Sequence, residues 1–409
     1  MTAVSNKLHL ISKMCLRSMS TSGKSDHSCK LLVLGGGAGG CSAAAKFVNK
    51  LGKGKVIILD PAEVHYYQPM FTLIGGGVKQ LPESFRPMSN VLPKNAMWIK
   101  DSVAKILPNQ NCVKTNSGLQ ISYEYLVVAL GIELHFEKVK GLQEALTDPM
   151  SGVSSNYSPM YAERTFENLS RLKQGNAVFT LPNTPIKCAG APIKACFISE
   201  HFIQKAGHRK NVNFFYRTSL PVFYSVKVYA DELQKLADQR GINVATSHEL
   251  IEVNHHNHEA KFLNIKEPQN VETIEFSMLH AVPPMFPPVV LAQSSPDLVD
   301  HTGYLRVNKA TLRHDNFPNI FGIGDCTNLP TSKTAAAVAG QIGILYRNLA
   351  NAMEGKDVSL KYDGYTACPL VTGYGSCIMA EFDYDLQPLE TFSFIDQSKE
   401  HLSMYVMKK

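Results

Sequence analysis

The chain contains 409 residues, of which 44% are hydrophobic and 19% are charged, so it can bury a large core and bulk disorder is excluded. The length suggests roughly two or three domains, and the nine cysteines include no C-x-x-C pair, which excludes a zinc ribbon or a thioredoxin-type motif. The formal net charge is +6. A nucleic acid, an anionic membrane or an acidic partner could each account for this charge, and the location of the basic residues distinguishes among them.

The amino-terminal residues 1–25 are rich in serine and contain Lys7, Lys13, Arg17 and Lys24 but no acidic residue. This amphipathic, acid-free composition predicts a mitochondrial transit peptide. Without this segment the chain has 37 Lys+Arg and 35 Asp+Glu, so its basic character gives no support for a nucleic-acid partner. The longest uncharged run, 276–296, contains five prolines, and we predict no transmembrane helix.

The first regular elements predict a strand–helix–strand unit at the start of a parallel sheet. A short apolar run at 30–34 precedes six small residues at 35–40, a helix-forming segment at 39–51 and an apolar strand at 55–60. Gly35, Gly37 and Gly40 match G-x-G-x-x-G, and Asp60 ends the second strand. In this context the glycines favour a pyrophosphate at the helix amino terminus, and the acid favours ribose hydroxyls. With a further strand at 121–131, residues 26–150 form the first part of a dinucleotide-binding domain.

Two later segments favour FAD over NAD in this domain. Residues 320–325 form an apolar strand that ends at Asp325 and precedes a helix of small residues at 335–346. This resembles the second flavin-binding signature of two-dinucleotide-domain flavoproteins, and residues 126–131 resemble their middle signature. We therefore expect residues 296–360 to be the second part of the FAD-binding domain.

Residues 151–295 predict a second Rossmann-like domain, so the fold class is α/β with two such domains in tandem plus a carboxy-terminal segment, 361–409. Its predicted strands are 177–181, 213–216 and 242–245, and its helices are 192–206 and 229–239. The strand 177–181 leads into Pro182 and Asn183 instead of a glycine-rich turn. NAD(P)H is therefore not expected as the electron donor.

Cys188 lies where the missing glycine turn would be, just before the helix that begins near Pro192. A helix amino terminus and the cations Lys187 and Lys194 favour a thiolate there, but a buried structural cysteine is an equal alternative from local sequence. Cys368 precedes a proline, and nothing in the spacing indicates that it meets Cys188. His255, His256 and His258 fall in a polar turn between strands and predict a solvated loop, so we expect no metal site.

The chain closely resembles the sulfide:quinone oxidoreductases of the animal mitochondrial type. The resemblance covers nearly all of the chain from residue 30 onward, and its longest matching strings are 67–70, 183–192, 321–337, 362–374 and 380–384. It implies two redox cysteines, Cys188 and Cys368. It also implies flavin contacts at the following residues: Gly35, Gly37, Ala38, Gly39, Gly40, Asp60, Gln68, Val103, Asp325 and Lys333.

The resemblance implies thiol–disulfide chemistry coupled to FAD. Hydrosulfide attacks a bridge between the two cysteines at Cys368 and leaves a persulfide there, and the sulfur anion released on Cys188 donates to the flavin. An acceptor such as glutathione or sulfite removes the sulfane sulfur, and two electrons pass to ubiquinone. The resting bridge is a disulfide or contains an extra sulfur.

The chain departs from its relatives at two places. Residues 131–160 contain no cysteine, so we expect non-covalent FAD. The relatives continue past Lys409 into an apolar tail that docks on the inner mitochondrial membrane. We expect either a truncated chain or a weaker peripheral membrane contact. The alternatives are a type II NADH:quinone dehydrogenase and a flavin- and sulfur-binding form without turnover.

Overall fold

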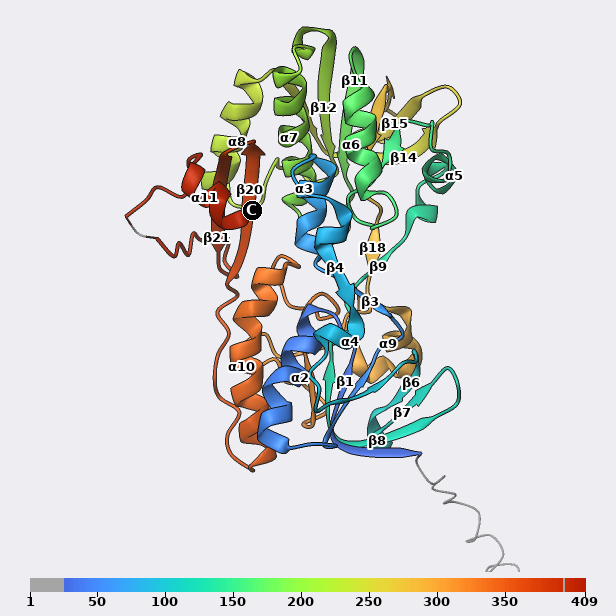
Figure 1. Ribbon diagram of the computed structural model, residues 1–409, viewed down its shortest axis with the longest axis vertical. Coiled ribbons are helices and arrows are strands. Elements are labelled where there is room, and N and C mark those ends of the chain that lie inside the picture. The colour runs from blue at the N-terminus through green and yellow to red at the C-terminus, as the bar shows by residue number, and fades with distance from the viewer. Residues whose placement is uncertain (1–25, 393) are drawn as a thin grey trace, which may run out of the picture.

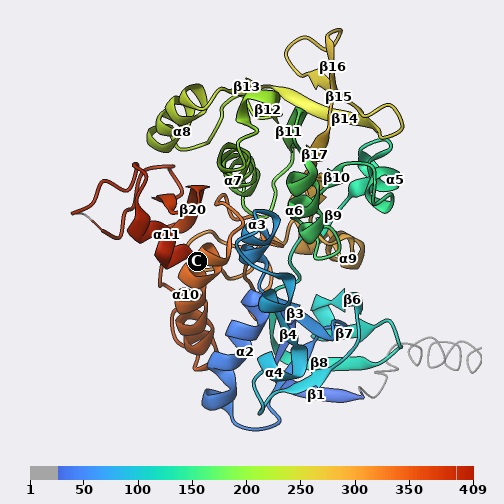
Figure 2. The same ribbon diagram turned by 45° about the horizontal axis from the view of Figure 1, so that its top comes forward.

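The computed structural model describes residues 26–392 and 394–409, and the predicted transit peptide lies outside this part of the chain. Two α/β lobes are stacked along the long axis of the molecule, and the carboxy-terminal hairpin β20–β21 packs on the side of the upper lobe (Figure 1). The short helix α3 (Phe71–Gly75) lies between the lobes and contacts two helices of the upper one (Figure 2).

The lower lobe is built on a seven-stranded sheet with a parallel centre in the order β5-β2-β1-β8. Strand β19 pairs in parallel with the second half of β8, and the hairpin β6–β7 pairs in antiparallel fashion with its first half. Segments from both predicted parts of the FAD-binding domain thus share one sheet. The strands are β1 (His27–Leu34), β2 (Val56–Leu59), β5 (Met97–Ile99), β6 (Val103–Leu107), β7 (Cys112–Thr115), β8 (Gln120–Val128) and β19 (Ile320–Gly322).

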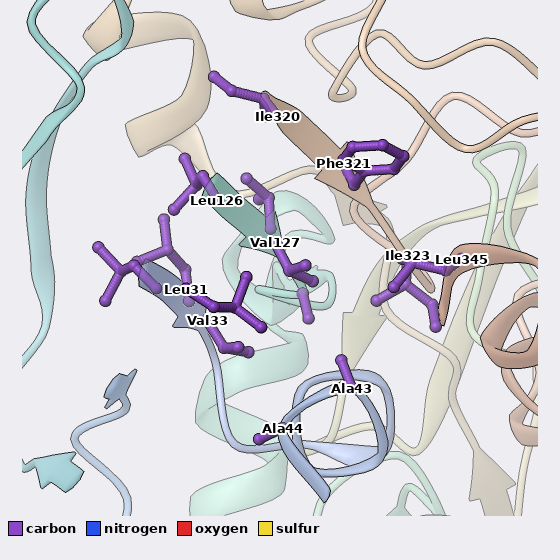
Figure 3. Close-up of a cluster of buried hydrophobic side chains, with 14 of the residues drawn as sticks. Leu31, Val33, Ala43, Ala44, Leu126, Val127, Ile320, Phe321, Ile323 and Leu345 are labelled. Carbon is purple, nitrogen blue, oxygen red and sulfur yellow. The ribbon is translucent and has the colours of Figure 1, made fainter. Parts of the chain in front are cut away.

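The central strands of this sheet are apolar on both faces because helices cover them. Leu31 and Val33 of β1 and Leu126 of β8 are fully buried. Helix α2 (Ala38–Leu51) turns its small side chains toward these strands, and α10 (Ala335–Met353) packs beside α2. Figure 3 shows side chains of both helices pointing at the strands. Burial of this shared core fixes where the glycine turn and the start of α10 lie.

The upper lobe contains a five-stranded, all-parallel sheet in the order β10-β17-β11-β12-β13. Helices α6 (Ala162–Arg171), α7 (Ala191–Lys205) and α8 (Lys227–Gln239) pack against its strands. Helix α7 is buried along most of its length because β20 lies against its other side. The strands are β10 (Val153–Ser154), β11 (Gly175–Leu181), β12 (Val212–Thr218), β13 (Ile242–Thr246) and β17 (Met278–His280).

The remaining elements are smaller. The antiparallel strands β14, β15 and β16 form a sheet beside the upper lobe, and the other strands pair as hairpins or short ribbons. These strands are β3 (Val64–Tyr66), β4 (Phe85–Pro87), β9 (Glu133–Leu134), β14 (His248–Asn254), β15 (Glu259–Asn264), β16 (Val271–Glu275), β18 (Met285–Phe286), β20 (Thr366–Gly373) and β21 (Ser376–Phe382). The short helices are α4 (Met88–Val91), α5 (Leu142–Thr147), α9 (Val289–Ser294) and α11 (Leu402–Lys408).

The predicted α/β fold class is confirmed, and the element boundaries differ by a few residues. The strand expected at 121–131 ends at Val128, because the chain leaves the sheet toward Gly131, which has φ +74°. The helix expected at 335–346 continues to Met353, since its buried positions extend to Ala350. Within the described residues, no helix combines the length and the apolar character needed to cross a bilayer.

Candidate functional site

The glycine turn between β1 and α2 adopts a geometry that side chains would obstruct. Gly35 has φ +96°, and a Cβ at Gly40 would lie 1.8 Å from the carbonyl oxygen of Gly35. A Cβ at Gly37, by contrast, would meet nothing within 4 Å. The turn is therefore closely packed at Gly35 and Gly40 but open at Gly37. Helix α2 begins at the next residue, Ala38, followed by Gly39. A phosphate group can approach the amino terminus of the helix at this open position.

Asp60 directly follows β2, and its side chain forms a hydrogen bond with the glycine turn. Its Oδ2 accepts a hydrogen bond from the backbone N–H of Gly36 at 2.5 Å, and its Oδ1 accepts one from Ala62 at 2.7 Å. The backbone N–H of Asp60 donates to Ile99 at the end of β5, and the chain then runs to Val103, the first residue of β6. The carboxylate therefore orders the turn and stands beside it.

A second polar cluster lies where β19 leads into α10. Thr334 caps α10 by accepting a hydrogen bond from the N–H of Ala337. Lys333 Nζ donates to the carbonyl oxygens of Asp325 and Thr327 at 2.7 and 3.0 Å and lies 4.1 Å from the centre of the Tyr304 ring. Burial raises the pKa of the Asp325 carboxyl, and the positive charge of Lys333 opposes this change.

The two clusters together fit a flavin dinucleotide. The open cradle at Gly37 suits a pyrophosphate, and the buried Asp325 carboxylate suits the hydroxyls of a ribityl chain. Lys333 and the amino terminus of α10 present positive charge beside Asp325. Gln68 begins a short 3-10 helix, Gln68–Met70, immediately before α3, so it comes from the segment between the lobes.

Cys188 and Cys368 come together between α7 and β20. Their Sγ atoms lie 3.5 Å apart as free thiols, although the residues are 180 positions apart in the chain. Cys188 has φ +88°, a left-handed conformation that is strained for a residue with a Cβ. Its carbonyl oxygen accepts hydrogen bonds from the N–H of Ala191 at 2.8 Å and from Tyr157 Oη at 3.3 Å, which hold this turn in place.

Gly190 allows this approach of the two cysteines. A Cβ at Gly190 would lie 2.4 Å from Cys368 Sγ and 2.6 Å from a methyl group of Leu370. Tyr224 covers the pair from the loop before α8 and is 5% exposed. Any residue larger than glycine would push β20 away from the turn that carries Cys188.

Lys194 sets the charge state of the pair. Its Nζ lies 3.5 Å from Cys188 Sγ and 3.8 Å from Cys368 Sγ, and its side chain is 4% exposed. The hydrogen bond from Cys368 and the charge of Lys194 hold the pKa of Cys188 well below its usual range, against the effect of burial. The pKa of Cys368 is raised by its hydrogen bond with Cys188 and by burial. Of the two cysteines, Cys188 is therefore the one whose surroundings favour the thiolate form.

Lys187 is not among the groups that most affect the pKa of Cys188. Its backbone pairs with that of Lys333, and the charged group that affects its amine is Asp325. Lys408 of α11 is one of those groups, because its charge lowers the pKa of Cys188 alongside that of Lys194. Burial lowers the pKa of Lys408 itself to about 8.

Sequence reasoning missed four residues around the cysteines: Tyr157, Gly190, Tyr224 and Lys408. Only Gly190 carried a sequence signal, since it lies two residues after Cys188 and two residues before the predicted helix 192–206. The histidines 255, 256 and 258 lie in the turn between β14 and β15. Across residues 26–392 and 394–409, no cluster of three or more His, Cys, Asp or Glu side chains is suited to hold a metal ion.

The chain is similar in sequence and in fold to known proteins. Residues 29–341 match the pyridine nucleotide-disulphide oxidoreductase family. The chain is 50% identical to the mitochondrial sulfide:quinone oxidoreductase of Mus musculus, over 93% of this chain and 83% of the mouse protein. It is 43% identical to the mitochondrial sulfide:quinone oxidoreductase of Dictyostelium discoideum, again over 93% of this chain and 83% of the relative. The solved structure of sulfide:quinone oxidoreductase from Aquifex aeolicus has a similar fold, with a TM-score of 0.79 at 19% identity over 93% of this chain and 89% of that one.

Proposed function

Because this chain belongs to the mitochondrial sulfide:quinone oxidoreductases, within the pyridine nucleotide-disulphide oxidoreductase family, we propose that it oxidises hydrogen sulfide and reduces ubiquinone. The observation that carries the proposal is the pair Cys188 and Cys368, 3.5 Å apart with a buried lysine at both sulfurs. Two cysteines at this separation form a disulfide after a small movement.

The difference between the two cysteines gives the reaction a direction. In the oxidised protein, hydrosulfide attacks the bridge at Cys368, the Cys188 sulfur leaves as a thiolate, and Cys368 becomes a persulfide. A thiol with the lower pKa leaves faster in such an exchange, and Cys188 is the one whose pKa is lowered. Lys194 neutralises the charge that the leaving sulfur acquires.

The complete reaction balances in atoms and electrons. The sulfane sulfur passes from Cys368 to a nucleophilic acceptor, and we propose glutathione or sulfite in this role. The bridge between the cysteines forms again, and two electrons go to ubiquinone with two protons, one from hydrosulfide and one from solvent. The cysteines therefore act as a carrier that returns to its starting state after each sulfide.

We propose that FAD is held by the two polar clusters and by the further residues that the family resemblance implies. Together these residues are Gly35, Gly37, Ala38, Gly39, Gly40, Asp60, Gln68, Val103, Asp325 and Lys333. A bound flavin supplies two-electron chemistry between a thiolate and a quinone, which side chains do not carry out themselves. Residues 131–160 contain no cysteine, so we propose that FAD is held without a covalent bond.

The cellular place of the protein is part of the proposal. The curated relatives are named as mitochondrial, and the basic, acid-free residues 1–25 support import into the same organelle. Ubiquinone is a membrane-dissolved substrate, so we propose a peripheral contact with the inner mitochondrial membrane.

Anaerobic mixing of the purified FAD-loaded protein with sulfide tests the function. Sulfide is expected to bleach the flavin absorbance, and a soluble ubiquinone analogue is expected to restore it. Cys188→Ser and Cys368→Ser should each abolish turnover, because either change removes the bridge. Normal turnover by either variant, or an unchanged wild-type spectrum after addition of sulfide, contradicts the proposal.

The same experiment separates the alternatives. Bleaching by NADH but not by sulfide identifies an NADH:quinone dehydrogenase. Bleaching by sulfide without reoxidation by the quinone analogue identifies a flavin- and sulfur-binding protein that does not turn over. Cys196→Ser is a matched control, because this cysteine lies on α7 but is buried on the side of Glu200 and Arg209 and has a raised pKa. Its turnover should equal that of the wild type.

A further inference from the structure

Lys187 is a lysine of the site that the cysteine chemistry does not use. It directly precedes Cys188, yet its backbone pairs with that of Lys333 across the space between the lobes. Its N–H donates to the sulfur of Met285 at 3.4 Å, which fixes the orientation of this part of the turn. Residues 187 and 188 therefore present their side chains to different surroundings.

Lys187, Lys333 and Asp325 form one group of charges. Burial lowers the pKa of both lysine amines, to about 8 for Lys187, and the Asp325 carboxylate opposes both changes. Burial raises the pKa of Asp325, and the two lysines oppose that change in turn. Asp325 is thus affected by both lysines, and each lysine is affected by Asp325.

The charges of this group are not satisfied by direct pairs. Among the described residues, no ion pair within 4.0 Å involves Lys187, Lys333 or Asp325. The Lys333 amine donates its hydrogen bonds to two backbone carbonyl oxygens. A charged amine that is partly removed from water is stabilised by a nearby negative charge. With two cations and one carboxylate, the group carries an excess positive charge and fits an additional negative charge.

The position of the group points to the flavin site. Asp325 and Lys333 line a recess together with Gly324 and Thr334 at the start of α10. The charges of Asp325 and Cys188 also influence each other, so this recess lies within electrostatic range of the thiolate. Two electrons that arrive here with a single proton would leave one negative charge, which Lys187 and Lys333 together can compensate.

We propose that Lys187 acts on the flavin side of the site: with Lys333 it forms a pair of cations around Asp325 that raises the reduction potential of the bound flavin. Lys194 acts on the sulfur side. The inference rests on the proposed function, because it takes the recess as the flavin site. Of the two lysines on either side of Cys188 in the sequence, Lys194 thus acts on the cysteine sulfurs and Lys187 acts on the flavin.

The reduction potential of the bound flavin tests this assignment. In an anaerobic titration against a reference dye, Lys187→Met is expected to bind reduced flavin about tenfold more weakly relative to oxidised flavin. For a two-electron couple this is a shift of about 30 mV to more negative potential. Lys187→Arg keeps the charge and should restore the wild-type potential. A potential in Lys187→Met equal to that of the wild type overturns the proposal.

A second measurement separates a charge effect from a structural one. The pH profile of Cys188 alkylation in the reduced protein should be the same in Lys187→Met and in the wild type, whereas Lys194→Met should shift it. A shift of equal size in both variants overturns the separation of roles. Lys187→Gln gives the same two measurements if Lys187→Met does not fold. Loss of sulfide bleaching in the wild type contradicts the proposed function and leaves the potential shift as an independent result.

Discussion

Replacement of Lys194 by methionine removes the cation at the two sulfurs while keeping the length of the side chain. At 3.5 Å and an effective dielectric constant of 20, the attraction between an ammonium group and a thiolate is about 4 to 5 kcal/mol. The hydrogen bond from Cys368 and the charge of Lys408 remain. We therefore expect the pKa of Cys188 to rise.

Alkylation of the reduced protein by iodoacetamide measures this change, because only the thiolate reacts. Mass spectrometry at Cys188 gives the rate at each pH, and the inflection in Lys194→Met should move to higher pH. At neutral pH the rate should fall at least tenfold. Lys205→Met is the matched control, because Lys205 is exposed at the far end of the same helix, about 16 Å along its axis.

Two results would refute this reasoning. An unchanged inflection in Lys194→Met would mean that the hydrogen bond from Cys368 and the charge of Lys408 hold the thiolate without Lys194. An equal change in Lys205→Met would indicate a general effect of net charge. Far-ultraviolet circular dichroism and the thermal midpoint of each variant show whether the fold is kept. Lys194→Met should lower the midpoint, because it leaves the half-buried Cys188 thiolate without the cation that compensates its charge.

Three further changes test the geometry of the site. Gly40→Ala should yield protein without bound flavin and with a lower thermal midpoint, because its Cβ would lie 1.8 Å from the carbonyl oxygen of Gly35. The flavin absorbance per chain measures the loss of flavin. Gly190→Ala should slow disulfide formation, followed by thiol titration, because its Cβ would lie 2.4 Å from Cys368 Sγ; a normal rate would refute the steric argument. Tyr157→Phe removes one hydrogen bond to the strained turn and should lower the free energy of unfolding by about 1 kcal/mol. A denaturant titration measures this change. An unchanged free energy of unfolding would mean that the hydrogen bond does not stabilise the turn.

The strand–helix–strand unit at the start of the chain could be predicted because its signals are local. The apolar run before the glycines and the acid after the next strand all lie within residues 30–60, and the tight turn requires glycine at fixed positions. The observed elements β1, α2 and β2 differ from the predicted ones by a few residues at their ends. The end of β8 was misjudged because Ala129 and Leu130 are apolar although they leave the strand.

The contact between the two cysteines could not be predicted from their spacing. Cys368 reaches Cys188 because the hairpin β20–β21 packs on α7, and this contact depends on apolar side chains from segments far apart in the sequence. Only the resemblance to a family indicated that the two residues act together. Lys408 was missed for a related reason, since α11 returns to Pro69 and to the sulfurs from the far end of the chain.

The two lysines near Cys188 show how helix geometry decides a role that composition leaves open. Lys194 lies in the first turn of α7, and side chains there point back toward the residues before the helix. That direction takes its amine to the sulfurs. Lys187 lies in the extended segment before Cys188, where successive side chains point to opposite sides. The charged group that affects its amine is therefore Asp325, even though Lys187 is the nearer lysine in the sequence.

This division of charge matters for a protein that moves electrons from sulfur to a second redox partner. A cation at the sulfurs stabilises the thiolate and makes it a better leaving group, but the same stabilisation makes the thiolate a weaker electron donor. A separate cation on the accepting side compensates, because it favours the reduced acceptor without stabilising the donor. Lys194 and Lys187 meet these two needs from opposite sides of Cys188 in the sequence, one in α7 and the other in the extended segment before it. Changes at the two lysines should therefore be separable, with Lys194 variants altering thiolate reactivity and Lys187 variants altering the potential of the acceptor.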